Sequence, residues 1–521
     1  MRIEVTELIK RSDKAWSAKE NWRGLLDEAY LYSRPQQNMF SAVAPGEKKN
    51  SHLYDSTGLT STRRAVNRYI NAVFPAEQFW ATLKAGPSVK KDQKKKLNEK
   101  LQQITEVAFS VINNKSNFQT AITEMGEEMW ISTGIMAVQK GPSVAEPVSF
   151  TCIPQIEVAL EEGPLGAVGA KFRKFSLPGH LIMPTWRDAK IPDDVAAEIA
   201  KEGEKPIDII EATYTHYESG KVYYDVVLVK KKVRIVERQP RRDRFVVGRL
   251  ARSPNEVNGR GPVLDALPDL KTINKLVELV LKNATLAVSG PYTVVDDGVL
   301  NPDNVVIGPM RLIPVARNAG HPAGPSIAPL ERSGSFDVAY LEHERLVSSI
   351  KEALLDDGLP EYEGMPKSAA EILARVRSYI ENTGSYYSRT QREVIVPTFQ
   401  IVLDILANDW QMIDEVIING DQISLEITGT LAMQRNAQEV EAVVQAMEIS
   451  KAMFGPEQTA LVFNVEEIIP WIARKLNVPE TLIRDKSDQE GIAEGAGAAI
   501  AAVEEADPGA GLSILQQTMR P

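Results

Sequence analysis

The chain of 521 residues contains a single cysteine, Cys152, and only five histidines. One thiol can form neither an internal disulfide framework nor a zinc site built from thiolates. The histidines are scattered without the spacing of a metal-ligand set: His52, His180, His216, His321 and His343. Each is more simply interpreted as a surface or core residue. The sequence therefore predicts neither a metal site nor a cofactor.

Long apolar runs are also missing, and no stretch approaches the roughly 18 residues that a membrane-spanning helix needs. The chain has 60 basic and 70 acidic residues, which give a formal net charge of −10. An acidic balance disfavours a protein that holds nucleic acid tightly, but it suits one along which nucleic acid slides. We therefore expect a soluble protein without a membrane segment, long enough for several domains.

The stretch Gly259-Arg260-Gly261-Pro262 precedes a helical pattern and could be interpreted as a phosphate-binding loop. A dinucleotide fingerprint would need a third glycine where Leu264 stands. Pro262 also removes a backbone N–H that an anion would need. These glycines therefore do not predict a nucleotide site.

Signatures of catalysis are equally scarce. The chain contains neither a Gly-x4-Gly-Lys-Ser/Thr loop nor a Gly-x-Ser-x-Gly elbow. The acidic pairs Asp296-Asp297 and Asp356-Asp357 stand in turn-like segments, where adjacent acids are usually solvated. A two-metal nuclease or ATPase is thus a weak alternative, and we predict a protein that is not an enzyme.

The pattern of apolar residues divides the first half of the chain. Residues 1–135 are mainly helical in pattern, whereas residues 145–250 alternate with a period of two and contain a hairpin turn at Glu218-Ser219-Gly220. Between Lys221 and Arg249 stand ten basic residues and three acids. Such charge either prevents edge-to-edge strand pairing or contacts DNA or an acidic partner.

A long helix is predicted after Pro262, beginning near Pro268, and it carries Lys271, Lys275 and Lys282 on one polar face. A run of short strands and turns follows, and a second helical pattern begins at "FDVAYLEHERLVSSIKEALL". Next come the acidic segment "DDGLPEYEGMPK" and a capping box at residues 368–371. From this box a helix could run to about Asn408, with a kink at Pro397.

In this order of elements, the chain resembles the portal proteins of short-tailed bacteriophages, also called head-to-tail connectors. Three passages carry the resemblance: "NGRGPVLDALPDLKTINKL", "STRRAVNRYINAVFPAEQFWATL" and "SAAEILARVRSYIENTGSYYSRTQREVIVPTFQIVLDIL". The similarity covers residues 15–475, and its motifs are specific in combination rather than singly. It implies an α+β, mainly helical fold of the portal type, with a wing, a two-helix stem, a small α/β or β clip, a tunnel loop and a helical crown.

The resemblance also implies where each part lies along the chain. The expected parts are the wing (1–260, helical and then β-rich), the first stem helix (261–289), the clip (290–330), the second stem helix (331–355), the tunnel loop (356–367), the long wing helix (368–410), the C-terminal helical region or crown (411–484) and a low-complexity acidic tail (485–521), expected to be partly disordered.

Within this arrangement, Lys271, Lys275 and Lys282 would face either the channel or a neighbouring subunit. They would make weak, sequence-independent contacts with DNA phosphates, or ion pairs with acids of the next stem. Tyr362 and Lys367 of the tunnel loop are further candidates for contact with DNA.

The turn before the first stem helix has expected roles as well. Gly259 and Gly261 would form a flexible joint between wing and stem, while Pro262 and Pro268 would fix the start of the helix. Arg260 would pair with an acid of the same or a neighbouring subunit.

By resemblance, the protein would be a structural, homo-oligomeric ring, dodecameric in this family, at one capsid vertex of the virion. Double-stranded DNA would pass through it during packaging and ejection. Its other partners would be the terminase motor, tail adaptor proteins, and capsid and scaffold proteins, after assembly in the host cytoplasm. Two alternatives stay open: another ring-forming virion protein, such as a tail adaptor or a scaffold-like protein, and a metal-dependent enzyme acting on nucleic acid.

Overall fold

The computed structural model describes residues 2–37, 49–76, 78–289, 292–294, 327–329, 337–356, 384–428 and 430–463, together with 468–469, 471–472 and 475. The chain divides into two compact units. Unit 1 comprises residues 1–70, 119–138 and 150–397, and unit 2 comprises residues 71–118, 139–149 and 398–521. Helix exceeds strand over the described residues, which confirms the predicted α+β, mainly helical class.

The centre of unit 1 is an antiparallel sheet of five strands in the order β4-β5-β6-β7-β8. Its strands are β4 (Val158–Glu162), β5 (Val168–Pro178), β6 (Pro206–His216), β7 (Lys221–Leu228) and β8 (Val233–Arg238). The turn between β6 and β7 contains Gly220 at a φ of 65°, a left-handed conformation that glycine adopts without strain. This hairpin confirms the turn predicted at residues 218–220.

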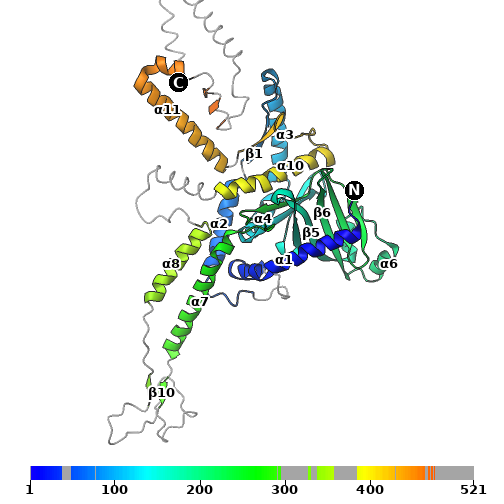
Figure 1. The fold of residues 1–521 in the computed structure, drawn as a ribbon, viewed down its shortest axis with the longest axis vertical. Helices are drawn as coiled ribbons and strands as arrows, with labels where there is room; N and C mark the ends of the chain where they lie inside the picture. Colours follow the sequence, from blue (N-terminus) through cyan, green and yellow to red (C-terminus); the bar gives the residue numbers. More distant parts are fainter. Residues whose placement is uncertain are drawn as a thin grey trace, which may run out of the picture. The chain divides into compact units, whose positions relative to one another are not determined.

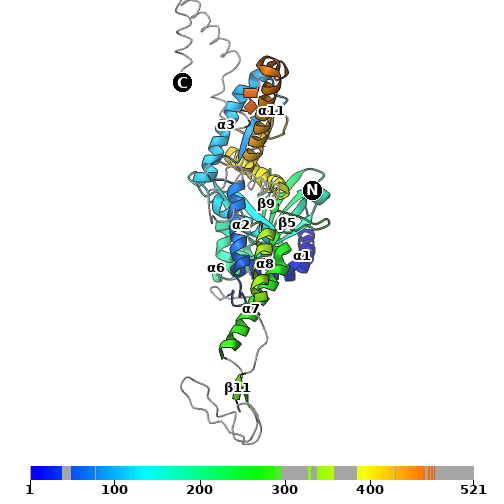
Figure 2. The same ribbon diagram turned by 90° about the vertical axis from the view of Figure 1, so that its left-hand side faces the viewer.

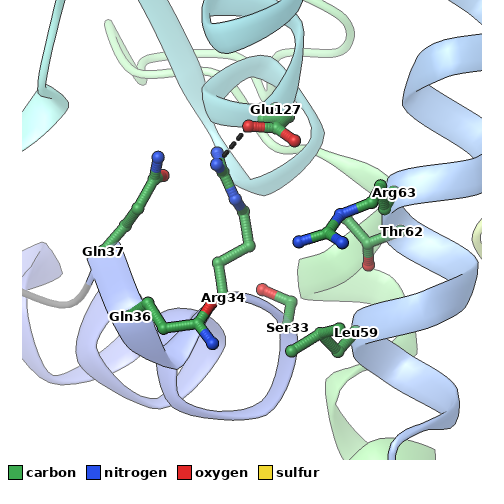
Figure 3. A pocket seen from close by; sticks show the side chains of 8 residues that line it. All are labelled: Ser33, Arg34, Gln36, Gln37, Leu59, Thr62, Arg63 and Glu127. Atoms are coloured by element: carbon green, nitrogen blue, oxygen red, sulfur yellow. Dashed lines mark ion pairs between the residues drawn. The ribbon is translucent and has the colours of Figure 1, made fainter. Parts of the chain in front are cut away.

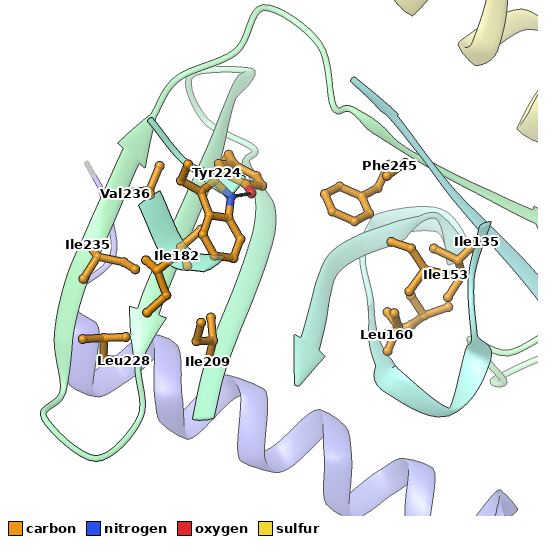
Figure 4. Close-up of a cluster of buried hydrophobic side chains, with 14 of the residues drawn as sticks. Ile135, Ile153, Leu160, Ile182, Ile209, Tyr224, Leu228, Ile235, Val236 and Phe245 are labelled. Carbon is orange, nitrogen blue, oxygen red and sulfur yellow. Dashed lines mark hydrogen bonds between the residues drawn. The ribbon is translucent and has the colours of Figure 1, made fainter. Parts of the chain in front are cut away.

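Apolar clusters pack against both faces of this sheet. Alternate residues of each strand point to opposite sides, so a strand such as β6 or β7 contributes to both clusters. Ile209 packs in one apolar cluster with Ile182 and Val195, from the segment that carries α5 (Ile182–Thr185) and α6 (Asp193–Lys201), as Figure 4 shows in part. The next residue, Ile210, packs in a second cluster with Leu8 of α1 (Val5–Ser33). Helix α1 therefore lies along one face of the sheet (Figure 1).

Many of the basic residues between Lys221 and Arg249 form ion pairs with acids of the same chain. The pairs are Lys230–Asp208, Lys231–Asp194, Arg234–Asp225, Arg238–Asp188 and Arg249–Glu393. Several of them lie on or next to β8, which is an edge strand. This arrangement favours a structural role for the charges over a contact with DNA or an acidic partner.

A second sheet has the strand order β3-β2-β9. Its strands are β2 (Thr133–Lys140), β3 (Val148–Ile153) and β9 (Phe245–Arg249). Helix α4 (Phe118–Ile131) directly precedes β2 in the sequence, and α2 (Thr57–Val73) packs against α4. Tyr69 of α2 and Trp130 of α4 meet edge to face, with ring centroids 5.2 Å apart, so these two helices share a core.

Two long helices leave this body side by side: α7 (Pro262–Ser289) and α8 (Asp337–Ala353) (Figure 1, Figure 2). Beyond them, β10 (Tyr292–Val294) pairs antiparallel with β11 (Ile327–Pro329). The predicted two-helix hairpin with strands between its helices is therefore present in the described residues. The remainder of the segment expected to be the clip lies outside them.

The predicted long helix is described from residue 384 onward. Helical residues 384–390 continue into a π-helical segment (Gln391–Ile395), α10 (Val396–Asp404) and a second π-helical segment (Ile405–Asp409). Pro397 stands just after the first π segment. Proline has no N–H for the usual bond one turn back, and the wider π turn accommodates that missing bond. The irregularity expected at Pro397 thus takes the form of a π-helical segment before it.

Unit 2 contains α3 (Lys91–Asn114), β1 (Ala81–Ala85), β12 (Ile423–Ile427) and α11 (Thr430–Val462). Strands β1 and β12 pair antiparallel although about 340 residues separate them in the sequence, with Leu83 opposite Leu425. The core of this unit is aromatic. The fully buried Trp80 lies within 5.7 Å, between ring centroids, of four phenylalanines: Phe74, Phe109, Phe118 and Phe399.

Candidate functional site

The turn before α7, which contains Gly259 and Gly261, packs against the end of α4 and the start of β2. The Gly259 N–H donates to Thr133 Oγ1 at 2.8 Å, and Ser132 Oγ donates to the Gly259 carbonyl at 2.6 Å. A Cβ on Gly261 would stand 2.0 Å from the carbonyl oxygen of Trp130, and one on Gly259 would stand 2.4 Å from that of Ser132. Only glycine fits at either position.

This packing corrects the expectation of a flexible joint. Both glycines are buried, neither is among the residues with positive φ, and their backbone groups are bonded to other parts of unit 1. The close approach of two backbone segments, rather than flexibility, is what requires Gly259 and Gly261. The sequence could not distinguish these causes, since both call for glycine.

The expected start of α7 also needs correction. The helix begins at Pro262, whose lack of an N–H costs nothing in the first turn. Pro268 lies inside the helix instead of marking its beginning. Because Pro268 has no N–H, the carbonyl of Leu264 lacks its usual partner within the helix. Pro268 itself is exposed and stands within two turns of the helix start, so the helix continues past it.

Arg260, between the two glycines, pairs within its own chain. Its Nε and Nη2 donate to the two carboxylate oxygens of Glu256, each at 2.7 Å. The guanidinium also lies 5.0 Å from the ring centroid of Trp22. Of the two alternatives predicted for Arg260, the same-chain partner is present, and a contact with a neighbouring subunit stays a prediction.

The base of the α7/α8 pair is fixed by polar contacts that the sequence did not single out. Asn274 accepts hydrogen bonds from the backbone N–H groups of Tyr54 (2.7 Å) and Asp55 (3.3 Å) and donates to the carbonyl of His52 (3.0 Å). These bonds satisfy the amide of Asn274, which allows this side chain to be buried at 8% exposure. In the sequence, the one sign of this role is that Asn274 interrupts the stripe of apolar residues on α7.

Two further bonds hold α8 at this base. Ser349 donates to Asp269 of α7 at 2.7 Å, and the indole N–H of Trp130 donates to the carbonyl of Leu354 at 3.1 Å. Leu346, Ile350 and Leu354 are buried beneath them. The base, which we define as residues 262–274 of α7 and 343–356 of the α8 segment, is thus a packed part of unit 1.

The far part of the pair, residues 275–285 and 338–342, is different. None of these residues is buried in the structure. Five of its apolar or aromatic side chains are half or more exposed: Leu279 at 51%, Leu281 at 50%, Val338 at 72%, Tyr340 at 65% and Leu341 at 72%. Two residues apart on a helix means roughly 200° of rotation, so Leu279 and Leu281 point to nearly opposite sides and α8 cannot cover both. We call this part the distal pair.

The three lysines predicted to contact DNA are all exposed on α7, and each pairs with an acid of the same chain. Lys271 donates to Glu28 at 2.9 Å, while Lys275 (2.9 Å) and Lys282 (2.5 Å) share Glu278. The hydrogen bonds from Lys282 and then Lys275 lower the pKa of the Glu278 carboxyl. We call Lys275, Glu278 and Lys282 the distal cluster, and its two lysines around one acid leave one excess positive charge.

The tunnel-loop candidates, Tyr362 and Lys367, lie outside the described residues. Of the predicted loop, only Asp356 is described; it is 6% exposed and lies 3.6 Å from the guanidinium of Arg68. Leu355 before it has a φ of 62°, so the chain turns sharply where α8 ends.

Neither a metal-ligand cluster nor a membrane-spanning helix occurs in the portion of the chain that the structure describes. The search for groups of three or more histidine, cysteine, aspartate or glutamate side chains that could hold an ion finds none there. Within the same residues, no helix is long and apolar enough to cross a membrane.

Comparison with known proteins finds a family and solved structures that match most of the chain. Residues 5–483 match the family described as "Bacteriophage head to tail connecting protein". A solved structure described as "Virion of native gene transfer agent (GTA) particle" is similar at 15% sequence identity and a TM-score of 0.32, over 79% of this chain and 91% of that chain. Another, "Neck of empty GTA particle computed with C6 symmetry", gives 14% identity and a TM-score of 0.33, over 78% and 90% of the two chains. No curated protein matches the sequence.

The family match covers most of the chain and defines its class, a structural protein of a phage-type virion rather than an enzyme. More particularly, the chain belongs to the family of bacteriophage head to tail connecting proteins. This membership confirms the resemblance to head-to-tail connectors that the order of elements indicated.

Proposed function

We propose that this protein assembles into a closed ring, a dodecamer as in the portal proteins it resembles, at one vertex of the capsid. Double-stranded DNA passes through the channel of the ring during packaging and ejection. The ring is also the platform on which the terminase motor docks first and the tail adaptor later. Family membership supports the connector role, and the properties of the α7/α8 pair support the ring and the channel.

The observation that carries the proposal is the exposure of the distal pair. A helix with apolar residues on several sides is normally buried, yet Leu279, Leu281, Val338 and Leu341 are each at least half exposed in the single chain. Covering a large aliphatic side chain fully contributes about 1.5–3 kcal/mol. Neighbouring copies of the same pair, packed around an axis, would cover these side chains and make self-association favourable.

The charges of α7 suit a channel through which DNA moves. Tight ion pairs with phosphates would stall movement, because every step would require them to break. Here Lys271 is neutralised by Glu28, and Lys275 and Lys282 share Glu278. The single excess positive charge of the distal cluster offers weak contacts, screened over about 8 Å at physiological salt. The chain as a whole is acidic, with a net charge of −10.

Electron microscopy and mass measurement of the purified protein test the ring. We expect closed rings with a central channel from the native chain, and predominantly single subunits from Val338→Ser/Leu341→Ser. Val144→Ser is the matched control, because Val144 is also exposed, at 57%, but is remote in sequence from the distal pair. Circular dichroism should show the same helix content for all three proteins. Normal rings from the double variant would contradict the proposal.

The remaining parts of the proposal follow the family role. The partners are the terminase motor, tail adaptor proteins, capsid protein and scaffold protein, and the protein is incorporated at the portal vertex after assembly in the host cytoplasm. Tyr362 and Lys367 are proposed to contact passing DNA. A tail adaptor that forms a ring is the second candidate function, and mass measurement with imaging of capsid-associated particles distinguishes it, because an adaptor joins only after the portal ring.

A further inference from the structure

A polar pocket of about 320 Å³ lies in unit 1 where the end of α1 approaches α2 and α4 (Figure 3). Its walls come from the last residue of α1, the turn Pro35–Gln37 that follows, and one side each of α2 and α4. The lining residues are Ser33, Arg34, Gln36, Gln37, Leu59, Thr62, Arg63 and Glu127. Only one of them, Leu59, is apolar, so the pocket is built to hold polar groups.

Buried polar atoms without partners gather at this pocket. Arg34 Nη1, Gln37 Oε1 and Thr62 Oγ1 are each inaccessible to solvent and make no hydrogen bond within the described part of the chain. Thr62 itself is 1% exposed. A buried polar group without a partner typically costs about 1–3 kcal/mol, so several around one cavity indicate a bound species that satisfies them.

Two of the three unpartnered groups, on Arg34 and Thr62, can donate hydrogen bonds as they stand, and Gln37 can do so after a half-turn of its amide. The guanidinium of Arg34 has a free N–H because its other nitrogen, Nη2, is engaged with Glu127. The Thr62 hydroxyl can rotate to donate into the pocket. The two ends of the Gln37 amide exchange by a half-turn of the side chain, which would present its NH₂ group in place of the oxygen.

The guanidinium groups of the pocket favour a ligand that accepts hydrogen bonds. Arg34 and Arg63 bring two positive charges, and Glu127 supplies the only negative charge among the lining residues. Burial raises the pKa of the Glu127 carboxyl, while Arg34 and then Arg63 act in the opposite direction. Two further acids, Glu124 and the buried Glu128, also act on Glu127 and Arg34, so the case for a ligand rests on the unpartnered groups and not on the net charge. Separate water molecules could bond to these groups one at a time, whereas one anion accepts hydrogen bonds from several of them at once and is held by the guanidinium groups.

We propose that this pocket is an oxyanion site that binds a phosphate or carboxylate group between Arg34, Arg63 and Thr62. Arg63 is exposed at the mouth and admits the ligand, whereas Thr62 and Arg34 bond to it inside. Such a group has two sources, a free anion and the carboxylate of an acidic side chain from a second copy of this chain. The site itself does not depend on the proposed ring.

Inorganic phosphate is the probe for the first source. Titration of the full-length protein, followed by calorimetry at constant chloride, should show saturable binding. Losing one charged hydrogen bond should weaken it about tenfold or more in Arg63→Gln. Arg64→Gln is the matched control, since Arg64 is the adjacent exposed arginine on α2 and does not line the pocket. Thr62→Val should also weaken binding without lowering the melting temperature, because the hydroxyl it removes has no partner among the described residues.

Self-association tests the second source. If a carboxylate from another copy fills the site, the assembled protein binds no phosphate, Arg63→Gln shifts assembly to higher protein concentration, and added phosphate competes with assembly in the native chain but not in this variant. Arg64→Gln again should behave like the native protein. Equal phosphate binding by the two arginine variants, or no binding together with unchanged assembly in Arg63→Gln, would overturn the proposal. Failure of the ring with intact phosphate binding would count against the proposed function alone.

Discussion

The ion pair between Arg249 of β9 and Glu393 of the first π-helical segment should be among the strongest single contributions to unit 1. The Arg249 side chain is 4% exposed and that of Glu393 is 17% exposed. Arg249 donates to Glu393 through Nη2 (2.7 Å), Nε (3.1 Å) and its backbone N–H (3.2 Å). Its remaining nitrogen, Nη1, donates to the Val257 carbonyl at 2.9 Å.

Glu393→Gln keeps the size of this side chain but removes its charge and one acceptor oxygen. Either Arg249 Nη2 or the Nε and backbone N–H would then face an amide NH₂ group, which cannot accept. Breaking a buried pair in this way costs about 3–5 kcal/mol, because it leaves an uncompensated charge. The oxygen that remains places the expected loss near the lower end, at about 3 kcal/mol.

Native-state hydrogen exchange measures this loss locally, which matters because the chain has two units and a single unfolding transition is not assured. A loss of about 3 kcal/mol corresponds to roughly a hundredfold faster exchange. We expect it in peptides covering 244–250 and 388–396, with β1 in unit 2 unchanged.

Two further variants identify the cause of this loss. Glu342→Gln, which breaks an exposed pair with Arg345, should change nothing measurable. The double substitution Arg249→Met/Glu393→Met should recover much of the stability, since the buried charge of Arg249 is removed together with its partner, and Arg389, which also bonds to Glu393, is part-exposed. Exchange within threefold of the native rate in Glu393→Gln would refute this reasoning.

Three other changes have signs fixed by the structure. Gly261→Ala should lower the stability of unit 1 by at least about 2 kcal/mol in denaturant titration, because its Cβ would meet the Trp130 carbonyl. Gly24→Ala is the control and should not destabilise, because its Cβ would meet nothing within 4 Å among the described residues. Burial lowers the pKa of Lys19 from 10.5 to about 7, so its penalty is full below pH 7 and disappears as pH rises toward 10.5. The native protein should therefore gain stability over that interval, and Lys19→Met should lack this gain in melts at several pH values. Glu278→Gln should raise the distal cluster from one to two excess charges and increase the salt dependence of DNA binding by about one released counterion, as measured by fluorescence anisotropy; an unchanged slope would place these lysines away from DNA.

Much of the fold could be predicted because it rests on local pattern. The hairpin at residues 218–220, the helix pair with strands between its helices, and the end of the long helix near residue 409 all follow from periodicity and turn residues over short windows. The class of protein followed from the resemblance to head-to-tail connectors in the order of these elements. For the same reason, the positions of Lys271, Lys275 and Lys282 on an exposed helix face were predictable, since three- and four-residue spacing places them together.

What could not be predicted depends on residues distant in the sequence. The partner of Arg249 stands 144 residues away, and the carbonyl groups that approach Gly259 and Gly261 lie about 130 residues away. The sequence alone does not distinguish a glycine pair that forms a flexible turn from one that is packed against another backbone segment. It also does not distinguish an arginine whose acidic partner is close in the sequence from one whose partner is distant. The pocket at Thr62 was invisible for the same reason, since α1, α2 and α4 each contribute only a few of its lining residues.

In the α7/α8 pair, the contacts that stabilise the single subunit and the surface proposed for ring assembly lie in different parts of one hairpin. At the base, Asn274, Ser349 and Trp130 make their hydrogen bonds within the chain, so changes there should lower the stability of the single subunit. In the distal pair, Val338 and Leu341 make little use of the chain's own surface, so their replacement costs the single subunit little. Under the proposed function, the same replacements remove the area that neighbouring copies cover. The distal pair is therefore separate from the contacts that stabilise the single subunit. Under the proposed function, subunit stability and ring assembly can be measured separately in one protein.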